Sequence, residues 1–545
     1  MRRRTHTVAI AAAAVAALGG TAIAATPDGT SRGPSTNKNP YVIPVADGVS
    51  TTSILSVGDG KTADNGYRMV GIPDGLGARK SSRGTFELFM NQELGGTLGI
   101  PRRHGQPGAF VSNYQIDRES LRVRSGRDLI NPPGGESGLR YWDYVTQTYR
   151  ATPSSGGPNP RHPGDTFEPQ NAPFSRFCSG TLSKEGQLYN RRSGRGYDGQ
   201  LYFANEENGN PGRLFGVTTD GEAQQLPRLG LFSWENTKPA YNETDRTLAI
   251  GQEDGSAGQS WIYSGVKSKK GNAFQRAGLT NGVNSVLDLV DESVSTDAGF
   301  RAKYGKNKPA DFDLSEVDWD QSAQRQNDEA AAEGLTLNRP EDGSWDPNNP
   351  NDYYFLTTEG GDKTPDGNDP PNTSRDGGGL WRMRFEDIEH PELGGTLTLL
   401  LDGSEEPKLN KPDNMDIDRN GNLLIQEDPG GNAHIARIVA YRIADGARGV
   451  LAQFDPAIFS ATPSNPQPEA TIDEESSGII DAADILGKNT YLFDAQVHKS
   501  TGDPETVEYG QLLAMRVKSF DAVYGGKLKA DHGDDEDDGH GGDRG

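Results

Sequence analysis

The sequence contains a single cysteine, Cys178, in a chain of 545 residues. A lone cysteine cannot form a disulfide within the chain, which excludes a fold held together by such bridges. Its thiol is therefore an inert buried group, an intermolecular partner or a group used in chemistry. A thiolate among carboxylates needs a metal to stabilise it, and thiolates favour iron or zinc over calcium.

Several catalytic motifs are also missing. The sequence has no Gly-x-Ser-x-Gly elbow, no His-Glu-x-x-His pair, no Gly-x-x-x-x-Gly-Lys loop and no Cys-x-x-Cys. It has eight histidines, and four of them lie at the chain ends or in a loop: His6, His162, His532 and His540. These absences disfavour a protein nucleophile and a His-rich zinc phosphatase, and they favour a metal shell made mainly of oxygen ligands.

Positive charge is scarce. The chain has 55 Lys and Arg against 78 Asp and Glu, a net charge of -23, which would repel nucleic acid and anionic membranes. Hydrophobic residues make up 32%, alongside 70 Gly and 34 Pro. This composition favours many short strands joined by long loops over a helical core. We therefore expect one large all-β domain, acting as a monomer without a nucleic-acid or membrane partner.

No apolar run is long enough to span a bilayer. At the N-terminus, Arg2-Arg3-Arg4 precede an Ala-rich stretch that ends in Ala22-Ile-Ala24, the small-residue pattern of a signal-peptidase site. We expect a signal peptide at 1–24, a linker at 25–40, the main domain at 41–528 and a disordered acidic tail at 529–545. The protein is then secreted and extracellular. The arginines favour twin-arginine export, while the residues that follow them leave the Sec route open.

Six short runs of bulky apolar residues each end in a carboxylate or its amide. Each run is too short for a helix and is bounded by Gly, Asp or Asn, so each is predicted to be a strand. The runs are Phe86–Glu93, Leu201–Glu207, Leu248–Asp254, Tyr353–Glu359, Leu423–Asp428 and Tyr491–Gln496. Repeated strands indicate repeated blades, whose strand ends would bring oxygen ligands for hard cations together on one face.

Two short motifs add candidate roles. Arg339-Pro-Glu341 offers a guanidinium fork for a phosphate next to a carboxylate for a metal. Taken alone, Arg339 is equally an ordinary ion-pair residue. Pro412-Asp-Asn414 supplies oxygen ligands just before a strand, although Asp and Asn are also common turn residues. The acids at strand ends have the same two interpretations, as metal ligands or as solvated loop carboxylates.

The order of these residues resembles the PhoX-type alkaline phosphatase family. The resemblance covers roughly residues 40 to 520 and rests on an ordered series of short motifs. The series is Asn91-Gln-Glu93, Cys178-Ser-Gly180, Glu206-Glu207, Glu235, Gln252-Glu-Asp254, Arg339-Pro-Glu341, Pro412-Asp-Asn414, Glu427-Asp428, Glu475-Ser-Ser-Gly478 and Gln496.

The resemblance implies a six-bladed, propeller-like single domain, twin-arginine export and hydrolysis of small phosphate monoesters. It also implies an Fe3+ and Ca2+ cluster, with Arg339 as the catalytic contact to phosphate. The metal ligands that it indicates are Cys178, Glu206, Glu235, Glu341, Asp413, Glu427 and Glu475. Further candidates are Glu93, Glu207, Glu253, Asp254, Asn414, Asp428 and Gln496.

The sequence departs from the family pattern in a few places. Ala204-Asn205 stand where the family usually has a second cysteine before its Glu-Glu pair. An insertion, Tyr189 to Gly199, follows Cys178 and is a candidate for altering access to the site. Long loop-rich regions at roughly 126–176 and 300–350 are candidate lids or substrate walls, and Asp320–Gly334 is an alternative short surface helix.

Three other functions stay open. A calcium-dependent propeller lactonase or esterase, a phytase-like enzyme and a non-catalytic calcium-binding extracellular module would all retain the strand repeats. Iron together with calcium would support the phosphatase, whereas calcium alone would support the lactonase.

Overall fold

The computed structural model describes residues 29–81, 84–363 and 375–525. The predicted signal peptide at 1–24 and the predicted acidic tail at 529–545 lie outside these residues. Within the described residues, no helix is both long and apolar enough to cross a membrane. Part of the predicted linker, Thr30–Arg32, forms strand β1, because it pairs in parallel with β3 (Val49–Ser56).

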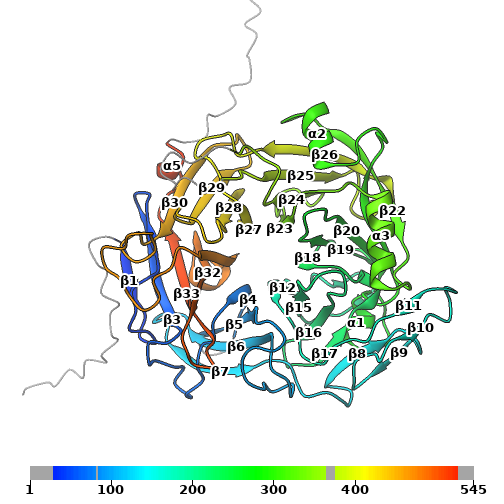
Figure 1. The fold of residues 1–545 in the computed structure, drawn as a ribbon, viewed down its shortest axis with the longest axis horizontal. Helices are drawn as coiled ribbons and strands as arrows, with labels where there is room; N and C mark the ends of the chain where they lie inside the picture. The colour runs from blue at the N-terminus through cyan, green and yellow to red at the C-terminus, as the bar shows by residue number, and fades with distance from the viewer. Residues whose placement is uncertain (1–28, 82–83, 364–374, 526–545) are drawn as a thin grey trace, which may run out of the picture.

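The described residues form six blades of antiparallel strands around a central axis (Figure 1). From the axis outward, blade 1 is β4 (Pro73–Lys80), β5 (Thr85–Gln92), β6 (Phe110–Asp117) and β7 (Val123–Asp128). Blade 2 is β12 (Phe177–Leu182), β15 (Leu201–Glu206), β16 (Leu214–Thr218) and β17 (Ala223–Gln225), with β8 (Leu139–Asp143) and β9 (Thr148–Arg150) at its outer edge.

Blades 3 and 4 share one sheet. Blade 3 is β18 (Trp234–Pro239), β19 (Arg246–Glu253), β20 (Ser260–Val266) and β21 (Val283–Leu289). Blade 4 is β23 (Pro340–Trp345), β24 (Asp352–Thr357), β25 (Gly379–Phe385) and β26 (Gly395–Leu401). Strand β22 (Ala310–Val317) pairs with both β21 and β26 and so joins the two blades into a nine-stranded sheet.

The two ends of the chain close the ring. Blade 5 is β27 (Pro412–Ile417), β28 (Asn422–Glu427), β29 (Arg437–Arg442) and β30 (Arg448–Phe454), with β2 (Val42–Pro44) added at its edge. Blade 6 is β31 (Glu474–Asp481), β32 (Thr490–Ser500) and β33 (Glu508–Val517), followed by β3 and β1. N-terminal strands therefore complete two C-terminal blades, and the fold is the predicted six-bladed all-β propeller.

Short helices and ribbons occupy the connections. The helices are α1 (Ala273–Arg276), α2 (Asp297–Lys303), α3 (Ala323–Glu333), α4 (Ala483–Leu486) and α5 (Phe520–Val523), with 3-10 turns at Pro227–Leu229 and Pro391–Leu393. Two small ribbons pair β10 (Gly157–Pro158) with β11 (Thr166–Phe167) and β13 (Tyr189–Asn190) with β14 (Arg195–Gly196). Helix α3 confirms the alternative of a surface helix within 320–334.

The six largest hydrophobic clusters of the described residues lie between neighbouring blades, one for each pair. Successive residues of one strand enter different clusters because strand side chains alternate between faces. In β24, for example, Tyr353 and Phe355 pack against blade 3, while Tyr354 and Leu356 pack against blade 5. Strands buried on both faces read as continuous apolar runs, which is why the six runs stood out in the sequence.

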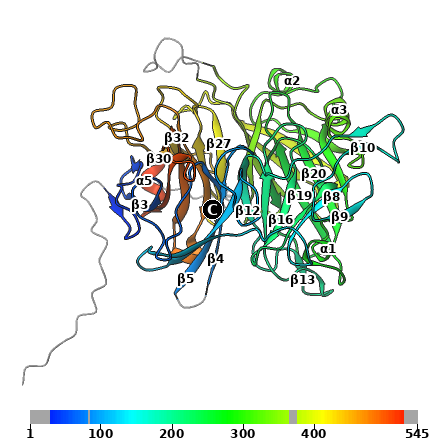
Figure 2. The ribbon, with the colours of Figure 1, turned by 60° about the horizontal axis from the view of Figure 1, so that its bottom comes forward.

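The six predicted strands are β5, β15, β19, β24, β28 and β32, the second strand of every blade. The sequence patterns did not reveal the innermost strands, and β23 lies within 300–350, a region predicted to be rich in loops. Each second strand runs toward the end of the ring where its inner strand begins. The insertion that holds β13 and β14 follows the other end of β12, and Figure 2 shows β13 and α1 at the end away from α2. The insertion, a candidate for altering access to the site, therefore lies at the opposite end of the ring from the start of the inner strands.

Candidate metal and phosphate site

One backbone hydrogen bond recurs in all six blades where the inner strand begins. The acceptor is the backbone carbonyl of the residue just before the inner strand. The donor is the backbone amide of the residue just after the part of the second strand that pairs with the inner strand. The pairs are Glu93–Ile72, Glu207–Arg176, Asp254–Ser233, Thr358–Arg339, Asp428–Lys411 and His498–Asp473, at 2.8–3.0 Å. This bond aligns the same two sequence positions of every blade at the axis.

The inner strands contribute the first set of axial side chains. Each strand carries its candidate ligand at its second residue: Asp74, Cys178, Glu235, Glu341, Asp413 and Glu475. In blades 1 to 5 the pairing of this strand with the second strand also shifts register near that end, whereas in blade 6 the shift lies further along, between Ser477 and Ile480. Bulges of this kind redirect side chains. The propeller thus supplies one acid or thiol from each blade.

The second strands contribute another set. Glu93, Glu207, Asp254 and Asp428 take the position that donates the repeated backbone bond in blades 1, 2, 3 and 5. Blade 4 has Thr358 there and blade 6 has His498. The two sets together bring nine carboxylates and one thiol to one end of the ring.

Three overlapping groups of these side chains have ligand atoms close enough to share a cation. They are Asp74, Glu93 and Cys178; Cys178, Glu207 and Glu235; and Glu235, Glu341 and Asp413, with ligand atoms within 4.8 Å of one another in each group. Because Cys178 and Glu235 each belong to two groups, the arrangement suits more than one cation. Cys178 is in the first two groups, whereas the third contains oxygen ligands alone.

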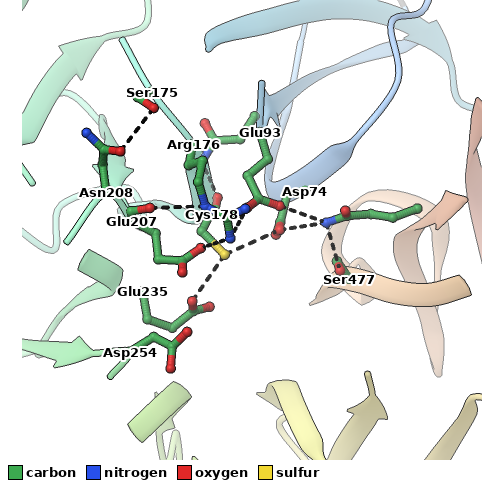
Figure 3. Close-up of polar contacts among 12 residues, drawn as sticks. Asp74, Glu93, Ser175, Arg176, Cys178, Glu207, Asn208, Glu235, Asp254 and Ser477 are labelled. Carbon is green, nitrogen blue, oxygen red and sulfur yellow. Dashed lines mark hydrogen bonds and ion pairs between the residues drawn. The ribbon is translucent and has the colours of Figure 1, made fainter. Parts of the chain in front are cut away.

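Cys178 lies between carboxylates of two other blades (Figure 3). Its Sγ is 3.1 Å from Oε2 of Glu235 and 3.5 Å from Oδ2 of Asp74. Asn91 fixes the backbone beside it by donating from Nδ2 to the Cys178 carbonyl at 2.5 Å. Burial, followed by the charges of Asp74 and Glu235, raises the pKa of the thiol well above its usual range. Without a cation this thiol stays protonated.

The carboxylates are also difficult to ionise together. Burial is the largest cause that raises the pKa values of Asp74, Glu235 and Glu341, and the charges of neighbouring acids add to it. Burial and the charge of Asp428 likewise raise the pKa values of Asp413 and Glu475. Oε1 of Glu235 and Oε1 of Glu341 are buried and accept no hydrogen bond. Such a donor set fits cations, which would stabilise every ionised form at once.

Two arginines pair with these carboxylates. The Arg176 guanidinium contacts Glu93 at 2.7 Å and also contacts Glu207 (Figure 3). Arg339 donates from Nε and Nη2 to the two oxygens of Asp254, at 2.8 and 3.1 Å. Its Nη2 also lies 3.3 Å from Oε1 of Glu341. Two guanidinium groups do not balance nine carboxylates, so the site retains a large excess of negative charge.

Glu206 and Glu427, predicted as ligands, bond to arginines outside this group. Arg213 donates to the two oxygens of Glu206 at 2.5 and 2.7 Å, and both side chains are almost fully buried. Arg437 and His434 pair with Glu427. Although burial raises the pKa of Glu427, these two partners lower it to about 2.

Glu253 is the last residue of the second strand in blade 3, as Glu206 is in blade 2 and Glu427 is in blade 5. It accepts hydrogen bonds from the Gln259 amide at 3.2 Å and from Nε1 of Trp261 at 3.0 Å. Burial raises its pKa to about 7. Its neighbour Asp254, like Glu207 and Asp428 beside Glu206 and Glu427, takes the axial position instead.

The remaining candidates, Asn414 and Gln496, connect blades near the axis. The side-chain oxygen Oδ1 of Asn414 accepts a hydrogen bond from the Gly478 backbone amide at 2.8 Å. Gln496 donates from Nε2 to Oδ2 of Asp74 at 2.9 Å and to Oε2 of Glu93 at 3.3 Å. Both amides hold neighbouring backbone or ligand groups in place.

Sequence reasoning missed Asp74 and Arg176. Pro73-Asp74 matches Pro412-Asp413, and both pairs begin an inner strand, so this recurrence is the signal that would have found Asp74. Arg176 precedes Cys178 by two residues, as Arg339 precedes Glu341. That shared spacing would have indicated Arg176.

Comparison with known proteins identifies this arrangement. The family model described as alkaline phosphatase PhoX matches residues 198–462. This match spans slightly less than half of the chain and confirms the predicted resemblance to the PhoX alkaline phosphatase family. The chain is a hydrolase of phosphate monoesters. The stretch matched to PhoX includes Glu235, Arg339, Glu341 and Asp413.

One solved structure supports the same fold. PhoX from Pseudomonas fluorescens, solved in complex with the transition-state analogue vanadate, is 13% identical, with 87% of this chain and 96% of that chain covered and a TM-score of 0.57. A luciferin-regenerating enzyme matches at 9% identity over 82% and 92%, with a TM-score of 0.30. The NanB sialidase of Streptococcus pneumoniae matches at 8% over 85% and 70%, with a TM-score of 0.34. No curated protein matches the sequence.

Proposed function

We propose that this PhoX-family chain is an exported phosphatase that needs iron and calcium to release inorganic phosphate from small organic phosphate esters. The observation that carries the proposal is the set of three overlapping ligand groups, two of which share Cys178. A thiolate favours iron over calcium, whereas the all-oxygen group suits calcium. We therefore assign Fe3+ to the groups that contain Cys178 and Ca2+ to the group with Glu341 and Asp413.

The proposed ligands follow the axial positions. The inner-strand set contributes Asp74, Cys178, Glu235, Glu341, Asp413 and Glu475, and the second-strand set contributes Glu93, Glu207, Asp254 and Asp428. In this assignment Glu207 and Asp428 replace Glu206 and Glu427, whose oxygens already bond to Arg213 and Arg437.

When bound, these cations supply Lewis acidity and positive charge at the oxygens of the phosphate. Arg339 is the contact to phosphate that the protein itself provides. Its side chain is 27% exposed, while Glu341 below it is 1% exposed. With cations neutralising Asp254 and Glu341, the planar fork would be free to donate to two phosphate oxygens.

Vanadate bound to the P. fluorescens PhoX supports the same chemistry here, because vanadate mimics a phosphate in transfer. Export rests on the N-terminal signal pattern at residues 1–24. We propose secretion by the twin-arginine or the Sec route, and a monomer whose acidic surface binds neither nucleic acid nor membrane.

The alternatives use calcium without iron. A lactonase, a phytase-like enzyme or a binding module would have no use for a thiol that shares two ligand groups, so the position of Cys178 favours the phosphatase.

Elemental analysis of the purified protein, combined with an aryl-phosphate assay, tests the proposal. We expect iron and calcium together, and phosphate release that stops after chelation and returns with both metals. Calcium without iron, or hydrolysis of a lactone without hydrolysis of a phosphate ester, would contradict it.

A further inference from the structure

Arg176 and Arg339 occupy the same place in two different blades. Each is the residue just before an inner strand and lies two positions before a proposed ligand, Cys178 or Glu341. Each has a left-handed backbone, with φ of 50° and 56°. The carbonyl of each accepts the repeated backbone hydrogen bond, from Glu207 at 2.8 Å and from Thr358 at 3.0 Å. Ile72 and Lys411 have the same left-handed backbone at the equivalent positions of blades 1 and 5, so this conformation belongs to the repeated turn and places the two arginine side chains equivalently.

Their contacts also correspond. Arg176 lies between Glu93 and Glu207, and its Nε donates to the Glu207 carbonyl at 3.1 Å. Arg339 lies between Asp254 and Glu341. Each guanidinium therefore bridges two acids of the proposed metal centre.

The two arginines border different parts of this centre. Arg176 contacts one carboxylate from each of the two groups that contain Cys178 (Figure 3). Arg339 contacts Glu341 of the third group. Because the three groups form a chain through the shared Cys178 and Glu235, the arginines lie at two different positions along it.

The Arg176 side chain is accessible to solvent, unlike that of the neighbouring Arg213. Its side chain is 48% exposed, although Glu93 and Glu207 are 6% and 13% exposed. In the neighbouring structural pair, Arg213 and Glu206 are 4% and 3% exposed. Arg176 therefore covers buried acids while keeping access to solvent, where a substrate would enter.

We infer that Arg176 is a second phosphate-binding arginine, and that it and Arg339 hold the phosphate of the substrate from two sides. This inference rests on the proposed function, because bound cations are what would neutralise Glu93 and Glu207 and free the guanidinium. Two guanidinium forks match the charge of a dianionic monoester better than that of a monoanionic diester. Arg176 would thus strengthen selection for terminal phosphate groups.

The test is Arg176→Lys, which keeps the charge but loses the planar fork. We expect unchanged iron and calcium content. Because one well-placed hydrogen-bond donor is lost, kcat/KM for an aryl phosphate should fall by about 10- to 1000-fold. Inhibition by inorganic phosphate and by vanadate should be weaker by at least about 10-fold. Added guanidinium should restore part of the rate of Arg176→Ala.

Arg384→Lys is the matched control. Arg384 is 46% exposed and binds the buried Asp352 through two hydrogen bonds of 2.6 Å, but it lies on β25, away from the axis. This control should retain the wild-type inhibition by phosphate. Wild-type inhibition and kcat/KM in Arg176→Lys would overturn the inference, and so would loss of its metals, which would make Arg176 a residue that positions Glu93 and Glu207.

The two proposals fail in different ways. If the proposed function is wrong, the wild-type protein itself lacks iron or phosphatase activity. If only the role of Arg176 is wrong, the wild type is an iron-containing phosphatase, and the Arg176→Lys variant binds phosphate as tightly as the wild type.

Discussion

Glu206 and Glu207 are neighbours on one strand, yet the structure predicts opposite effects for their replacement. Glu206→Gln removes the charge that faces the buried Arg213 guanidinium, which keeps its own charge at 4% exposure. Breaking one side of a buried ion pair costs about 3–5 kcal/mol of the free energy of unfolding. Because both Glu206 oxygens bond to Arg213, the folded variant should bind its metals with unchanged stoichiometry.

Glu207→Gln acts on the metal centre instead. Burial, together with the charges of Glu93 and Asp254, raises the pKa of Glu207 even though Arg176 lowers it. Ionised Glu207 therefore opposes folding of the metal-free protein at neutral pH, and the chelated variant should be at least as stable as the chelated wild type. The metal-loaded variant should lose about 1.4 kcal/mol for each tenfold loss of metal affinity.

Denaturant unfolding of chelated and metal-loaded samples, with elemental analysis of each, measures both effects. We expect Glu206→Gln to be less stable than the wild type in both the chelated and the metal-loaded states. Glu207→Gln should be less stable than the wild type only in the metal-loaded state. Equal metal loss in the two variants, or destabilised chelated Glu207→Gln, would refute the assignment of axial positions.

Four other changes test separate parts of the structure. Cys178→Ser should lower iron content and any thiolate-to-iron colour together, while calcium content and the fold persist; unchanged iron would make Cys178 an inert thiol. Arg339→Lys should keep its metals but lose about 10- to 1000-fold in turnover of an aryl phosphate, with weaker phosphate inhibition; wild-type kinetics would make Arg339 a structural ion-pair residue. Burial lowers the pKa of His104 to about 4 from 6.5, so only the unfolded state gains a proton between these values. The free energy of unfolding should then fall by up to about 3 kcal/mol from pH 6.5 to 4, and His104→Phe should remove that part of the fall in denaturant titrations. Replacing residues 190–195 by a Gly-Ser turn should leave kcat/KM unchanged within about twofold, because β13 and β14 lie at the far end of the ring; a large change would place them near the substrate.

The fold could be predicted from its second strands and not from its inner strands. Runs such as Tyr353–Thr357 are buried between two blades, so both faces are apolar and the strand is visible in one window of sequence. The inner strand Pro340-Glu-Asp-Gly-Ser-Trp345 faces the polar axis and carries Pro, Gly and two acids, which resemble a turn. Its identity as a strand depends on the blade that surrounds it.

The site could be predicted as a region but not by side-chain direction. A one-residue step along a strand moves a side chain to the other face. Pairs such as Glu206-Glu207 therefore give no sign in the sequence of which carboxylate faces the axis, since that depends on the partner, here Arg213. The pairing of Arg176 with two blades was equally hidden, because Glu93 lies far from it in the sequence.

Closure of the ring by β33 determines when metals can be loaded during the life of the protein. This strand lies between β3 and β32, so the ring cannot close before the chain has been synthesised as far as Val517. The proposed ligands extend from Asp74 to Glu475 and come from all six blades. A nascent chain that has not reached Val517 thus lacks the closed ring that brings the proposed ligands together, and the proposed metals can be loaded only after that point.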